Sequence, residues 1–217
     1  IFYLHAPDHN IPIKQSLKAV QQAYTEGKFK IFGISNYSAW QVAQICEICS
    51  ANNWIAPKVY QGMYNVFTRD VEAELFPCLR HFGISFYAYN PLAGGILSGK
   101  YNRDEEPRSG RFNAKTGWGK AYRERFWNDS VFDGLTAMED VLQQHDTSIL
   151  EASIRWMYHH SCLRADHGDA VILGASSLSH LEANLNAAEG GPLHEDIVEQ
   201  FNIIAGSMCS KYPPYFR

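Results

Sequence analysis

Glycines and a lysine in one segment of the chain have the spacing of a phosphate-binding loop. The run "NPLAGGILSGKY", residues 90–101, places Gly94, four further residues, Gly99 and Lys100 in the order of the first part of a P-loop. A P-loop needs Ser or Thr at the next position to bind magnesium, and a helix directly afterwards, whereas Tyr101 and "NRDEEPRSG" follow here. The pattern therefore argues against a nucleotide triphosphatase. The glycines and the lysine still suit a backbone that closes over another phosphate.

A second possible phosphate site lies where an apolar run meets a helical pattern, in "VILGASSLSHLEANL". Gly174, Ser176 and Ser177 come at the expected start of the helix, where free backbone amides, the helix dipole and two hydroxyl groups favour an anion. The alternative is an ordinary helix cap, which accounts for one of the two serines. The spacing alone leaves both interpretations open.

The motif "CEIC" suggests a redox or zinc pair but has a simpler explanation. Val42, Ile45, Cys46 and Cys49 recur at helical spacing, so both thiols are expected on the buried face of a helix. No second CxxC is present to complete a zinc site. We therefore expect core cysteines and no metal. Five cysteines, an odd number in a chain of this size, suit the reduced thiols of the cytosol.

Composition limits the classes of partner. The 217 residues are 46% hydrophobic and 19% charged, which is typical of a globular protein. A formal net charge of −4, without a long basic run, argues against nucleic acid and anionic membrane surfaces as partners. No apolar run approaches the ~20 residues that a transmembrane helix needs. We expect a soluble cytoplasmic protein.

Predicted strands and helices alternate along the chain, and they must position the residues of the two glycine-containing segments. Apolar strand-like runs are expected at 1–7, 29–35, 58–65, 84–91 and 169–175. Helical patterns are expected at 13–28, 38–53, 69–83, about 130–145, 148–160 and 177–189, and in a last helix after residue 194. Tyr24 and Phe82 are expected to face the core, Pro77 is expected as a kink, and residues 91–129 are expected to form a long loop with short helical pieces.

Strands that are apolar on both faces and alternate with helices predict a parallel sheet covered on both sides. Two architectures fit this pattern. Five strands would complete an open doubly wound sheet, whereas a (β/α)8 barrel would lack three units. The pattern does not separate the two. In barrels, phosphate is commonly held by the loops after the last two strands, which is where the two glycine-containing segments would lie.

Several separate motifs occur in the order and spacing of a known family. The segments "FYLHAPD", "GISNYS", "VYQGMYN", "FYAYNPLAGGILSGKY", "GRF", "RWMYHH", "DAVILGASSL" and "YFR" resemble the aldo-keto reductase superfamily, most closely its aflatoxin aldehyde reductase branch, family 7. The resemblance runs from residue 1 to residue 217 and implies a single domain, the C-terminal two thirds of the family's domain. The implied fold is an incomplete (β/α)8 TIM barrel with strands 4 to 8 and the C-terminal helices.

The same resemblance implies NADPH-dependent reduction of aldehydes and ketones. Of the family's catalytic Asp, Tyr, Lys and His, only the His has a counterpart, His5, which would orient the substrate carbonyl and assist proton donation. A lone His at a strand end would otherwise be structural. We expect that three β/α units, with the other catalytic groups, are absent before Ile1, and that the 217-residue chain alone is inactive.

The resemblance also assigns residues to NADPH. They are Ser35, Asn36, Gln61, Tyr89, Asn90, Pro91, Leu92, Gly94, Gly95, Lys100, Arg111, Gly174, Ser176, Ser177, His180 and Asn184. The first three would bind the nicotinamide carboxamide, Tyr89 would stack on the ring, residues 90–111 would cover the pyrophosphate, and the last five would surround the 2′-phosphate and adenine. Related proteins usually carry Gln and a longer polar residue at His180 and Ala183, so the preference for NADPH over NADH is left open.

A last group concerns the substrate. Tyr122, Arg125 and Arg217 match positions that gather around an anionic substrate group, although they could also be solvated surface residues. We expect a small aldehyde or ketone as the substrate, such as a dicarbonyl of the aflatoxin dialdehyde type or succinic semialdehyde. A homodimer is one assembly that the chain could form. Two alternatives are a cofactor-binding module resembling potassium-channel β subunits, and an inactive truncated product that pairs its exposed strand edge with another chain.

Overall fold

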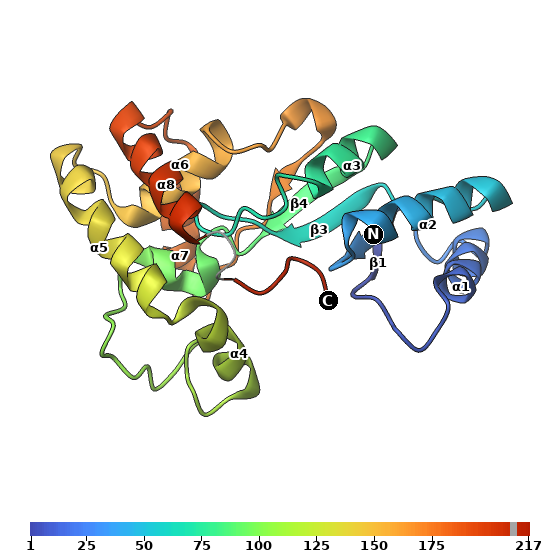
Figure 1. Ribbon diagram of the computed structural model, residues 1–217, viewed down its shortest axis with the longest axis horizontal. Helices are drawn as coiled ribbons and strands as arrows, with labels where there is room; N and C mark the ends of the chain where they lie inside the picture. The colour runs from blue at the N-terminus through green and yellow to red at the C-terminus, as the bar shows by residue number, and fades with distance from the viewer. Residues whose placement is uncertain (209–211) are drawn as a thin grey trace.

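Five parallel strands form one sheet in a computed structural model that describes residues 1–208 and 212–217 (Figure 1). Strands that follow each other in the chain are also neighbours in the sheet, in the order β1-β2-β3-β4-β5. They are β1 (Phe2–Leu4), β2 (Phe32–Ser35), β3 (Val59–Met63), β4 (Ser85–Tyr89) and β5 (Ala170–Val171). Among the described residues the sheet does not close, since β1 and β5 are its two edges, so the expected incomplete (β/α)8 barrel is confirmed.

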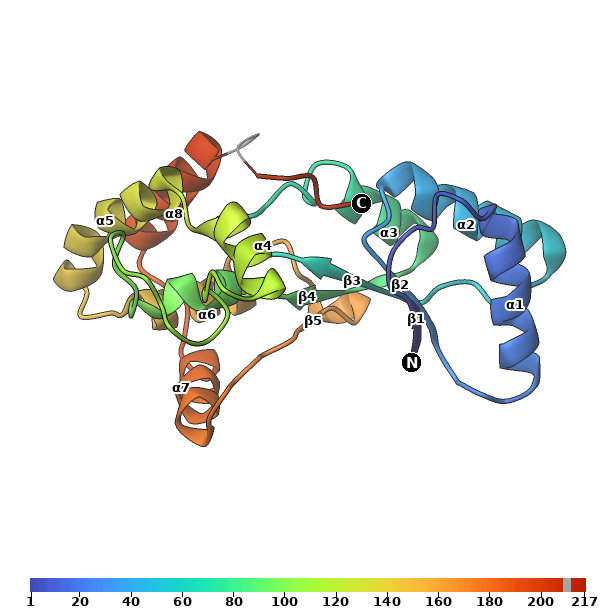
Figure 2. The same ribbon diagram turned by 90° about the horizontal axis from the view of Figure 1, so that it is seen from below.

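The helices lie in two groups on either side of the strands (Figures 1 and 2). The first group connects β1 to β4 and consists of α1 (Ile13–Thr25), α2 (Ala39–Asn52) and α3 (Leu75–Phe82). The second follows β4 and consists of the 3-10 helix η1 (Ala93–Ser98), α4 (Gly117–Phe126), α5 (Asp129–Gln144), α6 (Ile149–His159), α7 (Leu178–Ala188) and α8 (Glu195–Met208), with the short η2 (Ala165–His167) before β5. Within the described part of the chain, no helix combines the length and apolar content of a membrane span.

Aromatic side chains join the sheet to both helix groups. Phe86 of β4 lies edge-on to Phe76 of α3, with 4.8 Å between ring centroids. Tyr64, which follows β3, contacts Phe76 at 5.3 Å and Trp156 of α6 at 5.6 Å. All four side chains are buried, and such ring pairs stabilise a core by about 0.5–1.5 kcal/mol each beyond the area they bury. These contacts therefore join β4, α3 and α6 in one core.

Most predicted elements are confirmed, and the differences have local causes. Helix α3 begins at Leu75 rather than near residue 69, because a proline is tolerated only in the first turn of a helix and Pro77 lies there. Pro77 therefore does not produce the expected kink but lies in the first turn of a helix that begins later than predicted. Tyr24 is exposed instead of facing the core, and its ring lies against Phe29. The last predicted strand, 169–175, shortens to two residues, and Phe82 is only half-buried.

The predicted burial of the two motif cysteines is confirmed. Cys46 and Cys49 lie on the inner face of α2, and burial raises their thiol pKa values to about 12 and about 11. Such thiols remain protonated at neutral pH and are poor nucleophiles. They act as core residues.

One carboxylate holds the short strand β5 in place. Asp169 is almost fully buried and accepts hydrogen bonds from both terminal nitrogens of Arg80 on α3, at 2.9 Å for Nη1. The backbone amides of Phe86 and Arg164 also donate to it, at 2.7 and 2.8 Å. Charge-assisted bonds of this kind are among the strongest in proteins. Asp169 therefore links α3, β4 and the segment that leads to β5.

Replacing Asp169 should destabilise the protein strongly. Asp169→Ala leaves a partly buried guanidinium and two amides without their acceptor, and we expect a loss of about 3–5 kcal/mol in the free energy of unfolding, measured by urea denaturation. Asp166→Ala is the matched control, because Asp166 forms an exposed ion pair in the same segment and should change stability little. Equal losses in the two variants would contradict the assignment.

Candidate functional site

The carboxyl ends of all five strands meet at one edge of the sheet, because the strands are parallel. Ser35 ends β2 and is in register with Gln61 of β3, while Tyr89 ends β4 in register with Met63. A cavity of about 830 Å³ opens at this edge, and His5, which follows β1, lines it with the residues just named. Strand pairing thus brings together groups from four separate segments.

A second cavity, of about 490 Å³, adjoins the first. The two share Gln61, Tyr89, Asn90, Arg111 and Tyr122 as lining residues, so they form one continuous groove. The second cavity extends from β4 to the start of α7, and its lining includes the predicted cofactor residues Pro91, Leu92, Gly94, Gly95, Lys100, Gly174, Ser176, His180 and Asn184. Every residue predicted for the site lines one of the two cavities, with the single exception of Ser177.

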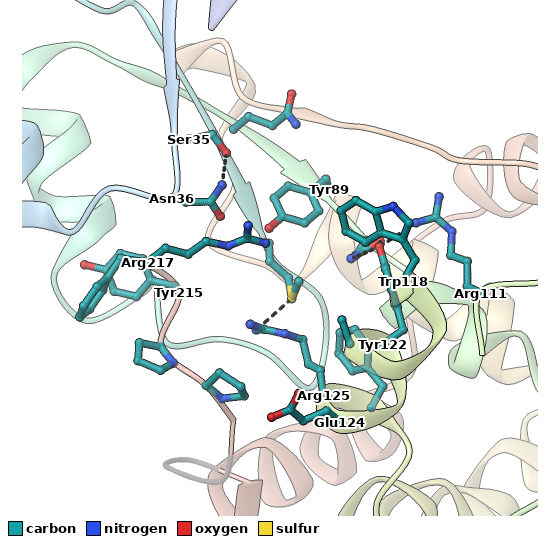
Figure 3. Close-up of a pocket in the computed structure, with 18 of the residues that line it drawn as sticks. Ser35, Asn36, Tyr89, Arg111, Trp118, Tyr122, Glu124, Arg125, Tyr215 and Arg217 are labelled. Carbon is teal, nitrogen blue, oxygen red and sulfur yellow. Dashed lines mark hydrogen bonds between the residues drawn. The ribbon is translucent and has the colours of Figure 1, made fainter. Parts of the chain in front are cut away.

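At one end of the groove, an asparagine fixes the ends of two strands. Asn36 has a left-handed backbone conformation, with φ of 65°, which Asn tolerates better than most residues. Its Nδ2 donates to the backbone oxygen of His5 at 2.7 Å and to Oγ of Ser35 at 3.0 Å (Figure 3). Both polar side chains are buried. These bonds orient a polar surface toward the first cavity.

The middle of the groove is built around the Tyr122 ring of α4. Its hydroxyl accepts a hydrogen bond from Nη1 of Arg111 at 2.7 Å and another from Nδ2 of Asn90 at 3.2 Å. A Cβ added to Gly94 would lie 2.5 Å from the Tyr122 ring, and Gly94 also has φ of 73°. Only glycine satisfies both conditions. The loop after β4 is therefore held against α4 in one conformation.

Two arginines point into the first cavity from different parts of the chain. Arg125 comes from α4 and Arg217 from the C-terminus, and their side chains extend toward the space below Tyr89 (Figure 3). Burial lowers the pKa of Arg125, and the nearby positive charge of Arg217 acts in the same direction. Within residues 1–208 and 212–217, neither guanidinium forms an ion pair with a carboxylate. The lining of the cavity therefore carries these two guanidinium groups in addition to the carboxylate of Glu124.

The C-terminal segment is held across the carboxyl edge of the sheet by three hydrogen bonds. Tyr215 donates its hydroxyl to Oε1 of Glu74 at 2.6 Å and accepts from the amide of Ala39 at 3.1 Å. The Arg217 amide donates to the backbone oxygen of Asn36 at 3.0 Å. These bonds place the Arg217 side chain in the cavity.

Sequence reasoning missed several aromatic and apolar groups of the first cavity. They are Met63, Trp118, Phe126, Tyr215 and Phe216. The segments "WGKAYRERFW" and "KYPPYFR" are rich in aromatic residues, and this was the available signal. Trp118 is strongly exposed at 69%, which suits a side chain that covers a bound ligand better than one that packs in the core.

At the far end of the groove, the two serines before α7 have different roles. Ser177 accepts a hydrogen bond from the backbone amide of His180 at 3.2 Å and so caps the helix, as the alternative interpretation holds. Ser176 lies 3.1 Å from Nδ1 of His180 and lines the second cavity. Asn184 is buried and donates to the backbone oxygen of Gly174 at 3.3 Å. Ser176 and His180 are thus the polar side chains that remain for a ligand here.

Comparison with known proteins gives consistent results along the chain. The model of the Aldo/keto reductase family matches residues 1–205. Human aldo-keto reductase family 7 member A3 is 52% identical over 224 residues, which cover 100% of this chain and 67% of that protein. Human aflatoxin B1 aldehyde reductase member 2 is 52% identical over 224 residues, which cover 100% of this chain and 62% of that protein. The chain therefore spans about two thirds of the length of these relatives.

A more distant relative matches over the same region. The oxidoreductase sirO of Leptosphaeria maculans is 34% identical over 214 residues, which cover 99% of this chain and 65% of that protein. The matched residues include all five strands and most of the groove at their carboxyl ends. By family model and by sequence identity, the chain belongs to the aldo/keto reductase family.

Proposed function

We propose that this chain forms the cofactor- and substrate-binding part of an NADPH-dependent reductase of aldehydes and dicarbonyls. The observation that supports the proposal most is the continuous groove, because it is lined by nearly all the residues that the family resemblance assigns to cofactor and substrate. Two relatives, an aldo-keto reductase and an aflatoxin B1 aldehyde reductase, have names that agree with carbonyl reduction. In this proposal residues 1–217 belong to one domain.

The donor set of the groove fits a dinucleotide. Lys100 and Arg111 offer cations beside the loop after β4, where Gly95 has φ of 106° and leaves the backbone open to close approach. The exposed start of α7 offers Ser176 and the helix dipole to a phosphate. Ser35, Asn36 and Gln61 offer amide and hydroxyl groups at the other end. When bound, NADPH would supply a hydride to the substrate carbon.

The remaining groups would bind and polarise the carbonyl. His5 at the end of β1 would hold the carbonyl oxygen, and Tyr89 would face the nicotinamide, consistent with the burial that raises the pKa of its phenol. Reduction also needs a proton donor for the oxygen, typically a contribution of ~10² to 10⁴-fold in rate. By the family resemblance, we place that donor, with its Asp and Lys, in the third of the relatives' length that this chain does not cover.

The proposed substrate class rests on Arg125 and Arg217, which form no ion pair with a carboxylate among the described residues. A guanidinium binds a carboxylate through two parallel hydrogen bonds, and Arg125 and Arg217 approach the first cavity from different sides. An aldehyde that carries a carboxylate, such as succinic semialdehyde, would place its acid between them. Trp118 and Phe216 would cover the hydrocarbon part.

The arginine pair predicts discrimination between acidic and neutral aldehydes. In this chain joined to the N-terminal segment of its relatives, Arg125→Ala should raise KM for succinic semialdehyde by ~10- to 150-fold, the equivalent of a charged hydrogen bond of about 1.5–3 kcal/mol. Steady-state kinetics with butanal, which lacks the acid, should show little change. Lys120→Ala is the matched control, since this exposed cation of the same helix lies outside the cavity. Equal effects on both aldehydes would exclude the arginine pair as a carboxylate site.

The start of α7 predicts a difference between the two nicotinamide cofactors. Ser176→Ala should weaken NADPH binding and leave NADH binding nearly unchanged, as measured by titration calorimetry, because only NADPH carries the 2′-phosphate. Ser177→Asp keeps a helix cap but adds a negative charge, so it should weaken NADPH more than NADH while preserving the melting temperature. Parallel weakening of both cofactors would show that the serines have only a structural role.

The open sheet predicts that the 217-residue chain needs an additional segment in order to be soluble and active. Unpaired edges at β1 and β5 favour association, so the chain alone should be oligomeric or poorly soluble and should not oxidise NADPH with succinic semialdehyde. Joining it to the N-terminal segment of a relative should restore a soluble, active protein, measured by size-exclusion chromatography and NADPH absorbance. A soluble monomer of the bare chain with equal turnover would refute the proposal. NADPH binding without turnover in the joined protein would favour the cofactor-binding module.

A further inference from the structure

Two histidines and an aspartate meet where α5 packs against α8. His145 is the C-cap residue directly after α5, His194 directly precedes α8, and Asp196 lies in the first turn of α8. One ligand atom from each of the three lies within 4.8 Å of the others. None of the three lines the two cavities of the candidate site. The cluster is therefore a separate feature, and the histidines lie too far apart in the chain for a sequence motif to reveal it.

The three side chains converge on one oxygen atom. Oδ2 of Asp196 lies 3.3 Å from Nε2 of His145 and 3.2 Å from Nδ1 of His194. The two imidazole rings are stacked, with 4.1 Å between centroids and 25° between planes. The Asp196 amide also lies 3.4 Å from Nδ1 of His194. One carboxylate oxygen is therefore shared between two imidazole nitrogens that come from the ends of two neighbouring helices.

We propose that His145, His194 and Asp196 bind a divalent transition metal ion of the Zn²⁺ class, with water completing the coordination. Two imidazoles and one carboxylate are ligands that such ions prefer over Ca²⁺ or Mg²⁺. In a tetrahedral site with bonds of ~2.0–2.1 Å, neighbouring ligand atoms lie about 3.4 Å apart. Both carboxylate–imidazole distances already match this value.

To bind one ion together, the two imidazole rings have to turn out of their stacked arrangement, because an imidazole binds a metal in the plane of its ring. The side chains of His194 and Asp196 are more than half exposed, so they can rotate without disturbing the core, whereas His145 is held more firmly at 24% exposure. A cation at this position lies between the C-terminal end of α5 and the N-terminal end of α8, so the two helix dipoles offset each other and the ligands themselves decide its binding. The ion would join α5 to α8, the helix that precedes the C-terminal segment carrying Arg217. The proposal does not depend on the reductase function.

Titration with Zn²⁺ alone tests the site. Tag-free protein, either the 217-residue chain or the form joined to a relative's N-terminal segment, is stripped with chelator, dialysed and titrated in a calorimeter. Cys162→Ser serves as the background, because an exposed thiol can also bind zinc. We expect one Zn²⁺ per chain at micromolar affinity and a higher melting temperature with zinc. His194→Ala should lower the affinity at least tenfold and abolish the thermal shift.

Two further variants make the result decisive. Asp196→Asn keeps the size of the side chain but removes its charge, so it should also weaken zinc binding while leaving the circular dichroism spectrum unchanged. His167→Ala removes an exposed histidine outside the cluster and should bind zinc as the parent does. Binding that is equally strong in His194→Ala and His167→Ala, or no binding below millimolar zinc in the parent, would overturn the proposal and leave the cluster as a surface ion pair.

Discussion

Parallel pairing of the strands is the constraint on which the rest of the structure depends. Because each strand runs in the same direction, every connection must return along a helix, and every strand delivers its carboxyl end to the same edge. His5, Ser35, Gln61 and Tyr89 meet there although no two of them are close in the chain. A change of register in one strand would separate them. The sheet thus sets the geometry of the site before any side-chain interaction does.

The sequence predicted most of the scaffold because local signals and tertiary packing agree there. Ser38 and Ser148 begin helices with capping boxes, and the apolar spacing of α8 places Ile197 and Phe201 in the core as expected. The predicted bounds of a helix and of a strand were wrong where a single residue had more effect than the apolar pattern around it. Pro77 moved the start of a helix, and the strand before α7 is short because Asp169, rather than a long ladder of backbone hydrogen bonds, holds it to its neighbour.

The candidate site could be predicted in part, for a similar reason. Residues that directly follow strands can be placed from the strands alone, and most of the predicted site is of this kind. Tyr215 could not be placed, because its position depends on long-range contacts. The bond from Tyr215 to Glu74, far away in the chain, sets the course of the C-terminal segment. No periodicity encodes such a contact. The assignment of individual residues to cofactor or substrate stays a prediction.

Arg125 and Arg217 bring two positive charges close together at the carboxyl edge of the sheet. Arg125 is half-buried, and in the described part of the chain neither side chain forms an ion pair with a carboxylate. Burial and the repulsion from Arg217 lower the pKa of Arg125, whereas Tyr89, Tyr122 and Asp70 act in the opposite direction. The hydrogen bonds of Tyr215 and of the Arg217 amide hold the pair together against this repulsion. In the proposed carboxylate site, an anion between the two guanidinium groups would offset this repulsion, and its binding would be favoured by that amount.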